Sequence, residues 1–144
     1  MKSTRGVIRL ILVFWTIATL GGCGGISDSS PTGPLSALTV ILSANKSSYA
    51  IGDTIIFTIK ANSDCYLTLY NTKSTGVASQ IFPNEFASDN LLTGGTTYEI
   101  PDENDMFDFI VTGPTGLEYV KAVVVDATNS NIQAEDTVSF QVVE

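Results

Sequence analysis

Carboxylates are the side chains of this sequence best suited to chemistry, and they are densest in one short stretch. Asp102, Glu103 and Asp105 lie close together, and Asp108 follows shortly after them. Calcium takes oxygen ligands from carboxylates and carbonyls on flexible loops, so this stretch is a calcium candidate. It lacks the spacing of an EF-hand loop, and charge runs are usually solvated. We therefore predict an acidic turn that holds neither a metal nor a cofactor.

The same carboxylates raise the alternative of a glycan hydrolase. Glycosidases use two carboxyl groups that face each other across a sugar, and Asp102 and Asp105 on a single loop need not do so. The chain contains no histidine, which removes Ser-His and Cys-His nucleophile pairs and the commonest transition-metal ligand. It also has no glycine-rich phosphate loop between a strand and a helix. The sequence favours a protein that is not an enzyme.

The first cysteine, Cys23, ends a segment typical of exported proteins. Residues 1–9 carry three basic side chains, residues 10–20 are apolar, and Leu-Gly-Gly then precedes the cysteine. The apolar run is too short for a membrane span, which needs roughly 20 residues, but it fits a secretory signal. The order Leu-Gly-Gly-Cys resembles the lipobox of bacterial lipoproteins. That resemblance implies cleavage between Gly22 and Cys23 and attachment of lipid, with acyl chains such as palmitate, to the Cys23 thiol.

Three segments follow from this interpretation. Residues 1–22 are predicted to be the lipoprotein signal peptide, and residues 23–37, rich in Gly, Ser and Pro, to be the lipidated cysteine and a flexible linker. Residues 38–144 form the domain. By resemblance to proteobacterial lipoproteins, the absence of Asp after Cys23 implies an anchor in the outer membrane. The alternative is an ordinary signal peptide with a chance cysteine.

The net charge of the mature chain limits the kinds of partner that it can bind. Three of the seven basic residues lie in the signal segment, which leaves four against fifteen acidic residues, a net charge of -11. A surface of this sign repels phosphate backbones and anionic lipid headgroups. We therefore expect membrane attachment through the lipid alone, and no nucleic-acid partner.

The pattern of residues 54–70 predicts the central strands of the fold. Two alternating apolar runs are joined by a few polar or small residues, which is typical of a β-hairpin. The two-residue side-chain period of a strand places two rows of side chains on the inward faces. These rows are Ile55, Phe57 and Ile59, and Cys65, Leu67 and Leu69. Cys65 has no partner once Cys23 is lipidated, so it is either a reactive thiol or, as its inward position favours, a small buried apolar residue.

The rest of the domain repeats short β-rich segments between turn residues. Strands are expected over residues 38–43, 77–82, 96–100, 106–112, 117–126 and 137–143, with a polar loop over 127–136. No helical period is present, so we predict an all-β fold, a single antiparallel, immunoglobulin-like β-sandwich of seven to eight short strands. A small closed barrel is the alternative. Val123, Val124 and Val125 leave apolar groups on both faces, which places that strand centrally.

One loop is the best candidate for recognition of a partner. Phe82, Pro83, Asn84 and Phe86 follow a predicted strand, and period-two alternation puts Ile81 and Phe82 on opposite faces of it. Proline fixes the exit direction and Asn84 can cap the turn. Aromatic residues are enriched at binding hot spots, so the loop is a candidate anchor. The alternative is a structural corner in which Phe82 or Phe86 fills the end of the sandwich.

An ordered set of motifs across the domain resembles a known family. The set runs from Tyr49 and the Gly52-Asp53 pair through Phe57, Asp64-Cys65-Tyr66-Leu67, Ile81-Phe82-Pro83-Asn84, Asp89-Asn90, Gly95, Tyr98, Ile100-Pro101 and Gly113-Pro114 to Gly116 and Glu118. It resembles the bacterial domain of unknown function 4384, and covers roughly residues 42–126. The resemblance implies an exported envelope or surface protein, and it implies no established activity.

These observations leave three function classes. The leading one is a non-catalytic cell-envelope lipoprotein that binds a protein or glycan partner. The second is a structural or assembly lipoprotein that joins a larger complex by adding a strand at a sheet edge. The third is the carboxylate-based glycan hydrolase considered above.

Overall fold

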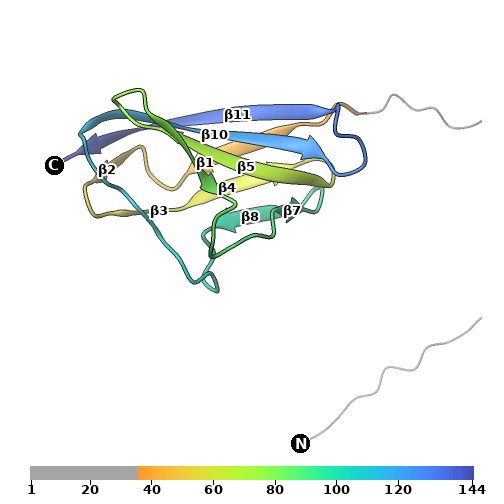
Figure 1. Cartoon of the computed structure of the whole chain (residues 1–144), viewed down its shortest axis with the longest axis horizontal. Coiled ribbons are helices and arrows are strands. Elements are labelled where there is room, and N and C mark those ends of the chain that lie inside the picture. The colour runs from red at the N-terminus through yellow and green to blue at the C-terminus, as the bar shows by residue number, and fades with distance from the viewer. Residues whose placement is uncertain (1–35) are drawn as a thin grey trace, which may run out of the picture. The chain divides into compact units, whose positions relative to one another are not determined.

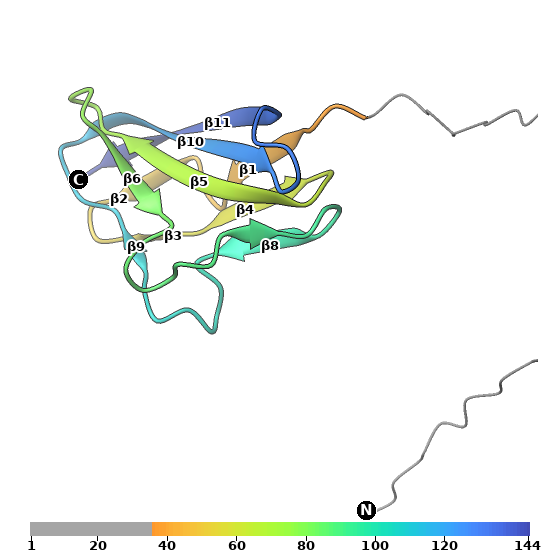
Figure 2. The same ribbon diagram turned by 45° about the vertical axis from the view of Figure 1, so that its right-hand side comes forward.

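The computed structural model describes residues 36–144, and this part of the chain is all-β without a helix. Eleven strands form a mostly antiparallel β-sandwich, and Figures 1 and 2 show the two layers. The sequence predicts this fold class. The strands are β1 (Val40–Ala44), β2 (Ser48–Ala50), β3 (Thr54–Ile55), β4 (Phe57–Ala61), β5 (Cys65–Thr72), β6 (Ala78–Phe82), β7 (Leu91–Leu92), β8 (Thr97–Ile100), β9 (Phe109–Ile110), β10 (Gly116–Asp126) and β11 (Gln133–Val143).

Two sheets carry the architecture. The larger has the order β2-β11-β10-β5-β6, with β7 paired to β5, and the smaller has the order β1-β4-β8. A two-residue ladder joins β3 to β9. All pairings are antiparallel except that of β2 with β11, which is parallel and brings an early and a late segment together. The number of strands exceeds the expected seven to eight because β3, β7 and β9 are two-residue bridges.

The core includes the alternating side chains that the sequence singles out. Ile55, Phe57 and Ile59 are buried from one layer, and the row from Cys65 to Leu69 is buried from the other. Val124 is buried while Val123 and Val125 are only half-buried. Strand β10 lies between β11 and β5 in the larger sheet, so its predicted central place is confirmed.

The predicted hairpin over residues 54–70 is wrong. Strand β4 pairs with β1 and β8, whereas β5 pairs with β10, β6 and β7, so the two runs lie in opposite sheets. Residues 62–64 therefore cross from one layer to the other instead of forming the turn of a hairpin. Both runs still bury the predicted faces, because inward burial is the same for a hairpin and for two facing sheets.

A β-bulge in β6 changes the predicted placement of Ile81 and Phe82 on opposite faces of the strand. Opposite β5, the register passes from Leu69↔Phe82 to Tyr70↔Gln80, so Ile81 is an extra residue on β6. A bulge turns the side chain that follows it, so strict alternation no longer holds. Phe82 is buried, and Ile81 packs against the same core from a half-buried position.

The last strand is longer than its hydrophobic pattern indicates. Strand β11 begins at Gln133, inside the predicted polar loop over residues 127–136, because polar side chains occupy its outward positions. The side chain of Asp136 accepts a hydrogen bond from the backbone N–H of Leu42 at 2.8 Å, which links β11 to β1 of the other sheet.

The predicted signal peptide, the lipidated Cys23 and most of the linker lie outside the described residues. Of the linker, Ser36 and Ala37 are described and exposed, and the carbonyl of Ala37 accepts a hydrogen bond from Asn62 Nδ2 at 2.8 Å. Within residues 36–144, no helix is long and apolar enough to cross a membrane.

Candidate functional site

The acidic stretch folds into a turn that uses its own carboxylates. Asp102 Oδ1 accepts hydrogen bonds from the backbone N–H groups of Asn104 at 2.6 Å and Asp105 at 3.1 Å. Asp105 Oδ2 accepts one from the N–H of Asp102 at 2.8 Å. Such Asx bonds satisfy the backbone within a tight turn.

These carboxylates do not form a common ligand set. Asp108 lines a pocket between the sheets, whereas Asp102 and Asp105 line a different depression beside β7 and β8. Glu103 is exposed. Across the described part of the chain, no three His, Cys, Asp or Glu side chains are grouped so that they could hold a metal ion.

The predicted recognition loop combines a buried and an exposed aromatic ring. Phe82 is 5% exposed and belongs to the core, whereas Phe86 is 65% exposed. Asn84 Oδ1 accepts hydrogen bonds from the N–H groups of Phe86 at 2.9 Å and Ala87 at 3.0 Å, so the amide caps the turn as predicted. Pro83 directly follows Phe82, the last residue of β6. The loop is therefore a capped corner that carries one outward phenylalanine.

Cys65 lies in the core and not at a surface site. It is fully buried and has no disulfide partner among the described residues. Burial raises the pKa of its thiol, and the neighbouring carboxylates of Asp126 and Asp64 raise it further. Both effects disfavour the thiolate, which is the reactive form of cysteine.

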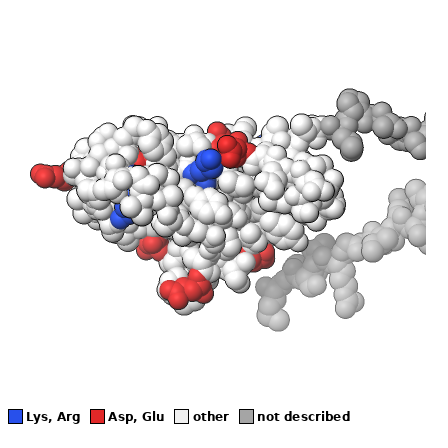
Figure 3. All heavy atoms as spheres, turned by 45° about the horizontal axis from the view of Figure 1, so that its top comes forward, with Lys and Arg blue, Asp and Glu red and all other residues white. Residues whose placement is uncertain are grey.

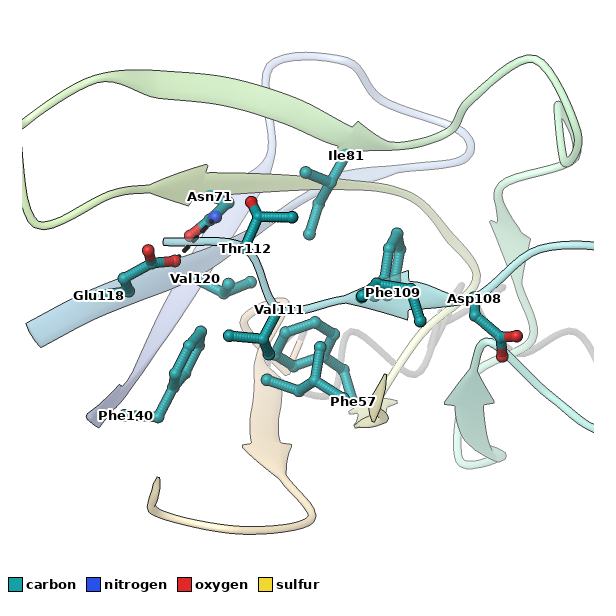
Figure 4. Close-up of a pocket in the computed structure, with 12 residues that line it drawn as sticks. Phe57, Asn71, Ile81, Asp108, Phe109, Val111, Thr112, Glu118, Val120 and Phe140 are labelled. Atoms are coloured by element: carbon teal, nitrogen blue, oxygen red, sulfur yellow. Dashed lines mark hydrogen bonds between the residues drawn. The ribbon is translucent and has the colours of Figure 1, made fainter. Parts of the chain in front are cut away.

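One pocket within residues 36–144 lies between the two layers, near the start of β10. Its volume is about 240 Å³, and Figure 4 shows the side chains that enclose it. Its walls are mainly apolar and come from both sheets, and its polar lining groups are Asn71, Asp108, Thr112 and Glu118. The apolar lining residues are Ile55, Phe57, Ile81, Phe109, Ile110, Val111, Val120 and Phe140.

Glu118 is the unusual residue of this pocket. It is 3% exposed and is the single buried charged side chain within residues 36–144. Strand register explains its place, because Glu118 lies two residues before Val120 on the inward face of β10 and opposite Phe140 of β11. A buried carboxylate is costly unless it is paired or hydrogen-bonded.

Asn71 supplies the one hydrogen bond that the side chain of Glu118 receives within residues 36–144. Asn71 is the cross-strand partner of Val120, and its Nδ2 donates to Glu118 Oε2 at 3.1 Å (Figure 4). An ionised carboxylate can only accept, so this contact also fixes the orientation of the amide. Glu118 Oε1 and Asn71 Oδ1 are both buried and have no hydrogen-bond partner within residues 36–144. The site therefore presents two acceptor oxygens with unused capacity.

Charged groups of both signs lie near the pocket. Figure 4 shows Asp108 at the opposite side of the lining group from Glu118. Lys73 contacts the lining, because its Nζ donates to Thr112 Oγ1 at 3.0 Å and to the carbonyl of Gly113 at 3.3 Å. Those two contacts keep the ammonium on the loop before β10. On the face drawn in Figure 3, charged side chains form separate spots and not a continuous patch.

Sequence reasoning did not assign Asn71 or Glu118 to a site. A signal was available, because Glu118 shares the period-two row of Val120 and Ala122, and Asn71 extends the inward row of Leu67 and Leu69. A polar residue that continues an inward apolar row is informative, because buried polar groups are rare without a reason.

Three comparisons with known proteins bear on this fold. No curated protein sequence matches the chain. Among solved structures, it resembles the sporulation control protein Spo0M from Bacillus subtilis, with a TM-score of 0.50 and 15% sequence identity. The match covers 75% of this chain and 50% of Spo0M, so the chain spans about half the length of that structure. At this identity the likeness shows the β-rich fold alone.

The sequence profile of a domain of unknown function (DUF4384) matches residues 48–128. The matched segment includes β2 to β10 and both polar residues of the pocket, Asn71 and Glu118. It makes up more than half of the 144 residues. The chain therefore belongs to the DUF4384 family.

Proposed function

We propose that this protein is a non-catalytic binding module of the bacterial cell envelope, held there through lipidated Cys23, and that it recognises its partner through the Glu118 pocket. The anchor part of the proposal is supported by the order of basic, apolar and Leu-Gly-Gly-Cys segments at the N-terminus. The implied location is the outer membrane.

One observation carries the binding role. Glu118 is almost fully buried, yet Oε1 and the neighbouring Asn71 Oδ1 lack partners within the described chain. Leaving such groups unsatisfied costs about 1–3 kcal/mol each, and more for a charged group. An apolar pocket with a few convergent polar groups is the usual form of a ligand site. A ligand that donates hydrogen bonds there would recover that cost.

The alternative of assembly by strand addition has weaker support from the sheet edges. The edges of the larger sheet are β2, of three residues, the two-residue β7, and β6, which carries the bulge at Ile81. The edges of the smaller sheet are β1 and β8, of five and four residues. Short or bulged edges are poor templates for another strand.

A capture experiment tests the binding role. The tagged, full-length protein is solubilised from envelopes in detergent, and co-purifying proteins and glycans are compared with those of a Glu118→Gln variant. We expect the variant to lose its partner while the matched variant of exposed Glu103, Glu103→Gln, keeps it. Equal capture by all three proteins would refute recognition through this pocket.

The anchor has its own test. In Cys23→Ala, labelled fatty acid should no longer be incorporated, because the thiol that carries the lipid is absent. Persistent acylation of that variant would refute the lipoprotein assignment without bearing on the pocket.

A further inference from the structure

We infer that the Glu118 pocket binds a primary alkylammonium group, delivered as the lysine side chain of a partner protein. This inference rests on the proposed function and names the ligand class for the same pocket. Its starting point is the pair of buried acceptors, Glu118 Oε1 and Asn71 Oδ1.

The chemistry of the two oxygens determines the kind of ligand. Both atoms accept and neither donates, so the complementary group must carry at least two N–H or O–H donors. Glu118 brings a carboxylate to the pocket, so a cation is favoured over a neutral donor. The domain as a whole has four lysines against fourteen acidic residues between positions 36 and 144, which favours the approach of cations.

The number of donors distinguishes an ammonium from a guanidinium. An ammonium has three donors, and two would be used by Glu118 and Asn71, which leaves one for water at the mouth. A guanidinium has five in a fixed fork, and most would be buried against apolar walls without acceptors. Polar groups buried without partners oppose binding, so the pocket discriminates against arginine.

The walls suit the stem of a lysine side chain. Val111, Val120 and Phe140 border the pocket together with Glu118, so the methylene groups would lie on apolar and aromatic surface while the ammonium reaches the carboxylate. Ile110 also lines the pocket and is 50% exposed, which provides an apolar rim for the rest of a bound polypeptide.

The chain's own Lys73 does not fill this role in the structure. Its ammonium donates to Thr112 and Gly113, and Glu118 receives its hydrogen bond from Asn71. A Lys73→Met variant removes this ammonium and leaves both pocket acceptors in place, so it serves as a control.

Titration of the full-length, ¹⁵N-labelled protein in detergent micelles tests the inference. The probes are Nα-acetyl-lysine amide, its uncharged isostere Nα-acetyl-norleucine amide, Nα-acetyl-arginine amide, and ethanolamine, which stands in for a lipid headgroup amine. Backbone amide shifts at Asn71 and Glu118 report occupancy. We expect saturable shifts with the lysine probe, and affinities at least about tenfold weaker for the other three, as loss of one charge-assisted hydrogen bond implies.

Variants assign the effect to the pocket. Glu118→Gln and Asn71→Leu should each weaken the lysine probe at least about tenfold, whereas Glu103→Gln and Lys73→Met should retain it. If Glu118→Gln fails to fold, Asn71→Leu and the four-probe comparison decide the question. Equal binding of lysine and norleucine probes, or stronger binding of arginine or ethanolamine, would overturn the inference. Unchanged shifts with every probe, as expected if water alone occupies the pocket, would also overturn it.

Failure of this inference can be told from failure of the proposed function. If Glu118→Gln loses the captured envelope partner but the lysine probe does not bind, the pocket recognises another chemical group. If capture does not depend on Glu118, the proposed function itself fails.

Discussion

The hydroxyl of Tyr49 donates a hydrogen bond to Asn45 Oδ1 at 2.6 Å and accepts one from the backbone N–H of Lys46 at 2.8 Å. The ring of Tyr49 is buried and meets Phe140 edge to face, with ring centres 5.3 Å apart. Asn45 Oδ1 also accepts from the N–H of Ile56 at 3.1 Å. One buried tyrosine thus fixes the turn between β1 and β2 to strand β11 and to the start of β4.

Tyr49→Phe should lower the free energy of unfolding by about 1–3 kcal/mol, because it leaves the Lys46 N–H without its acceptor and removes one bond to Asn45. Urea denaturation followed by far-ultraviolet circular dichroism measures the change in the free energy of unfolding. Tyr70→Phe is the matched control, because Tyr70 is exposed on the outer face of β5 and should change stability by less than about 0.5 kcal/mol. Equal effects of the two substitutions would contradict the role assigned to the Tyr49 hydroxyl.

Replacement by alanine of the two phenylalanines of the predicted recognition loop should have very different effects on the free energy of unfolding. Phe82→Ala should cost about 3–5 kcal/mol, because Phe82 is a core residue and its truncation leaves a cavity. Phe86→Ala should stay within about 0.5 kcal/mol, because that ring is exposed. Capture from solubilised envelopes then tests recognition by Phe86. A stable Phe86→Ala variant that keeps every partner excludes Phe86 as an anchor.

Cys65 should react with a maleimide slowly in the folded protein and fully after denaturation, because burial excludes the reagent and raises the pKa of the thiol. The raised pKa also predicts a pH effect on stability. The folded state then holds the thiol proton more tightly than the unfolded state does, which adds to the free energy of unfolding. This added stability is fully present below the ordinary pKa of 9.0 and is lost as the pH rises through the folded value. Cys65→Ala should remove this alkaline component. Rapid labelling of the folded protein would indicate an accessible thiol.

Millimolar calcium should leave the melting temperature unchanged, because the Asp102 and Asp105 carboxylates accept hydrogen bonds from their own turn and Asp108 lines a different pocket. A ligand that binds only the native state would raise it by mass action. Differential scanning calorimetry with and without calcium measures the shift. A clear rise that Asp105→Ala abolishes would establish a calcium site.

The sequence predicts the fold class well because β-sandwich burial depends on local alternation. The rows from Ile55 to Ile59 and from Cys65 to Leu69 are buried as predicted, since each strand has one inward face. Partner choice between strands is a long-range property. The short segment over residues 62–64 is compatible with a hairpin and with a crossing between sheets, and only packing of the whole domain selects the crossing.

The bulge at Ile81 and the Glu118 pocket illustrate a second limit. A single inserted residue opposite Tyr70 changes which side chains face inward, and the local pattern of β6 does not reveal it. Glu118 could have been placed on the inward face from its spacing to Val120. Its proximity to Asn71 depends on the β10–β5 register, which is fixed by the assembled sheet.

The described chain begins at one end of the sandwich and finishes at the other, and β10 starts near the C-terminal end (Figure 1). A force applied between Ser36 and the end of the domain that contains Glu118 therefore acts along the strands. The hydrogen bonds of the antiparallel β10–β11 ladder lie across that direction, over a register from Gly116↔Val142 to Val125↔Gln133. Because β10 lies between β11 and β5, a load applied along β10 acts in shear on both of its ladders and does not open them pair by pair. Because forced unfolding depends on the unfolding rate and not on equilibrium stability, the domain should resist tension along its long axis even if it melts easily.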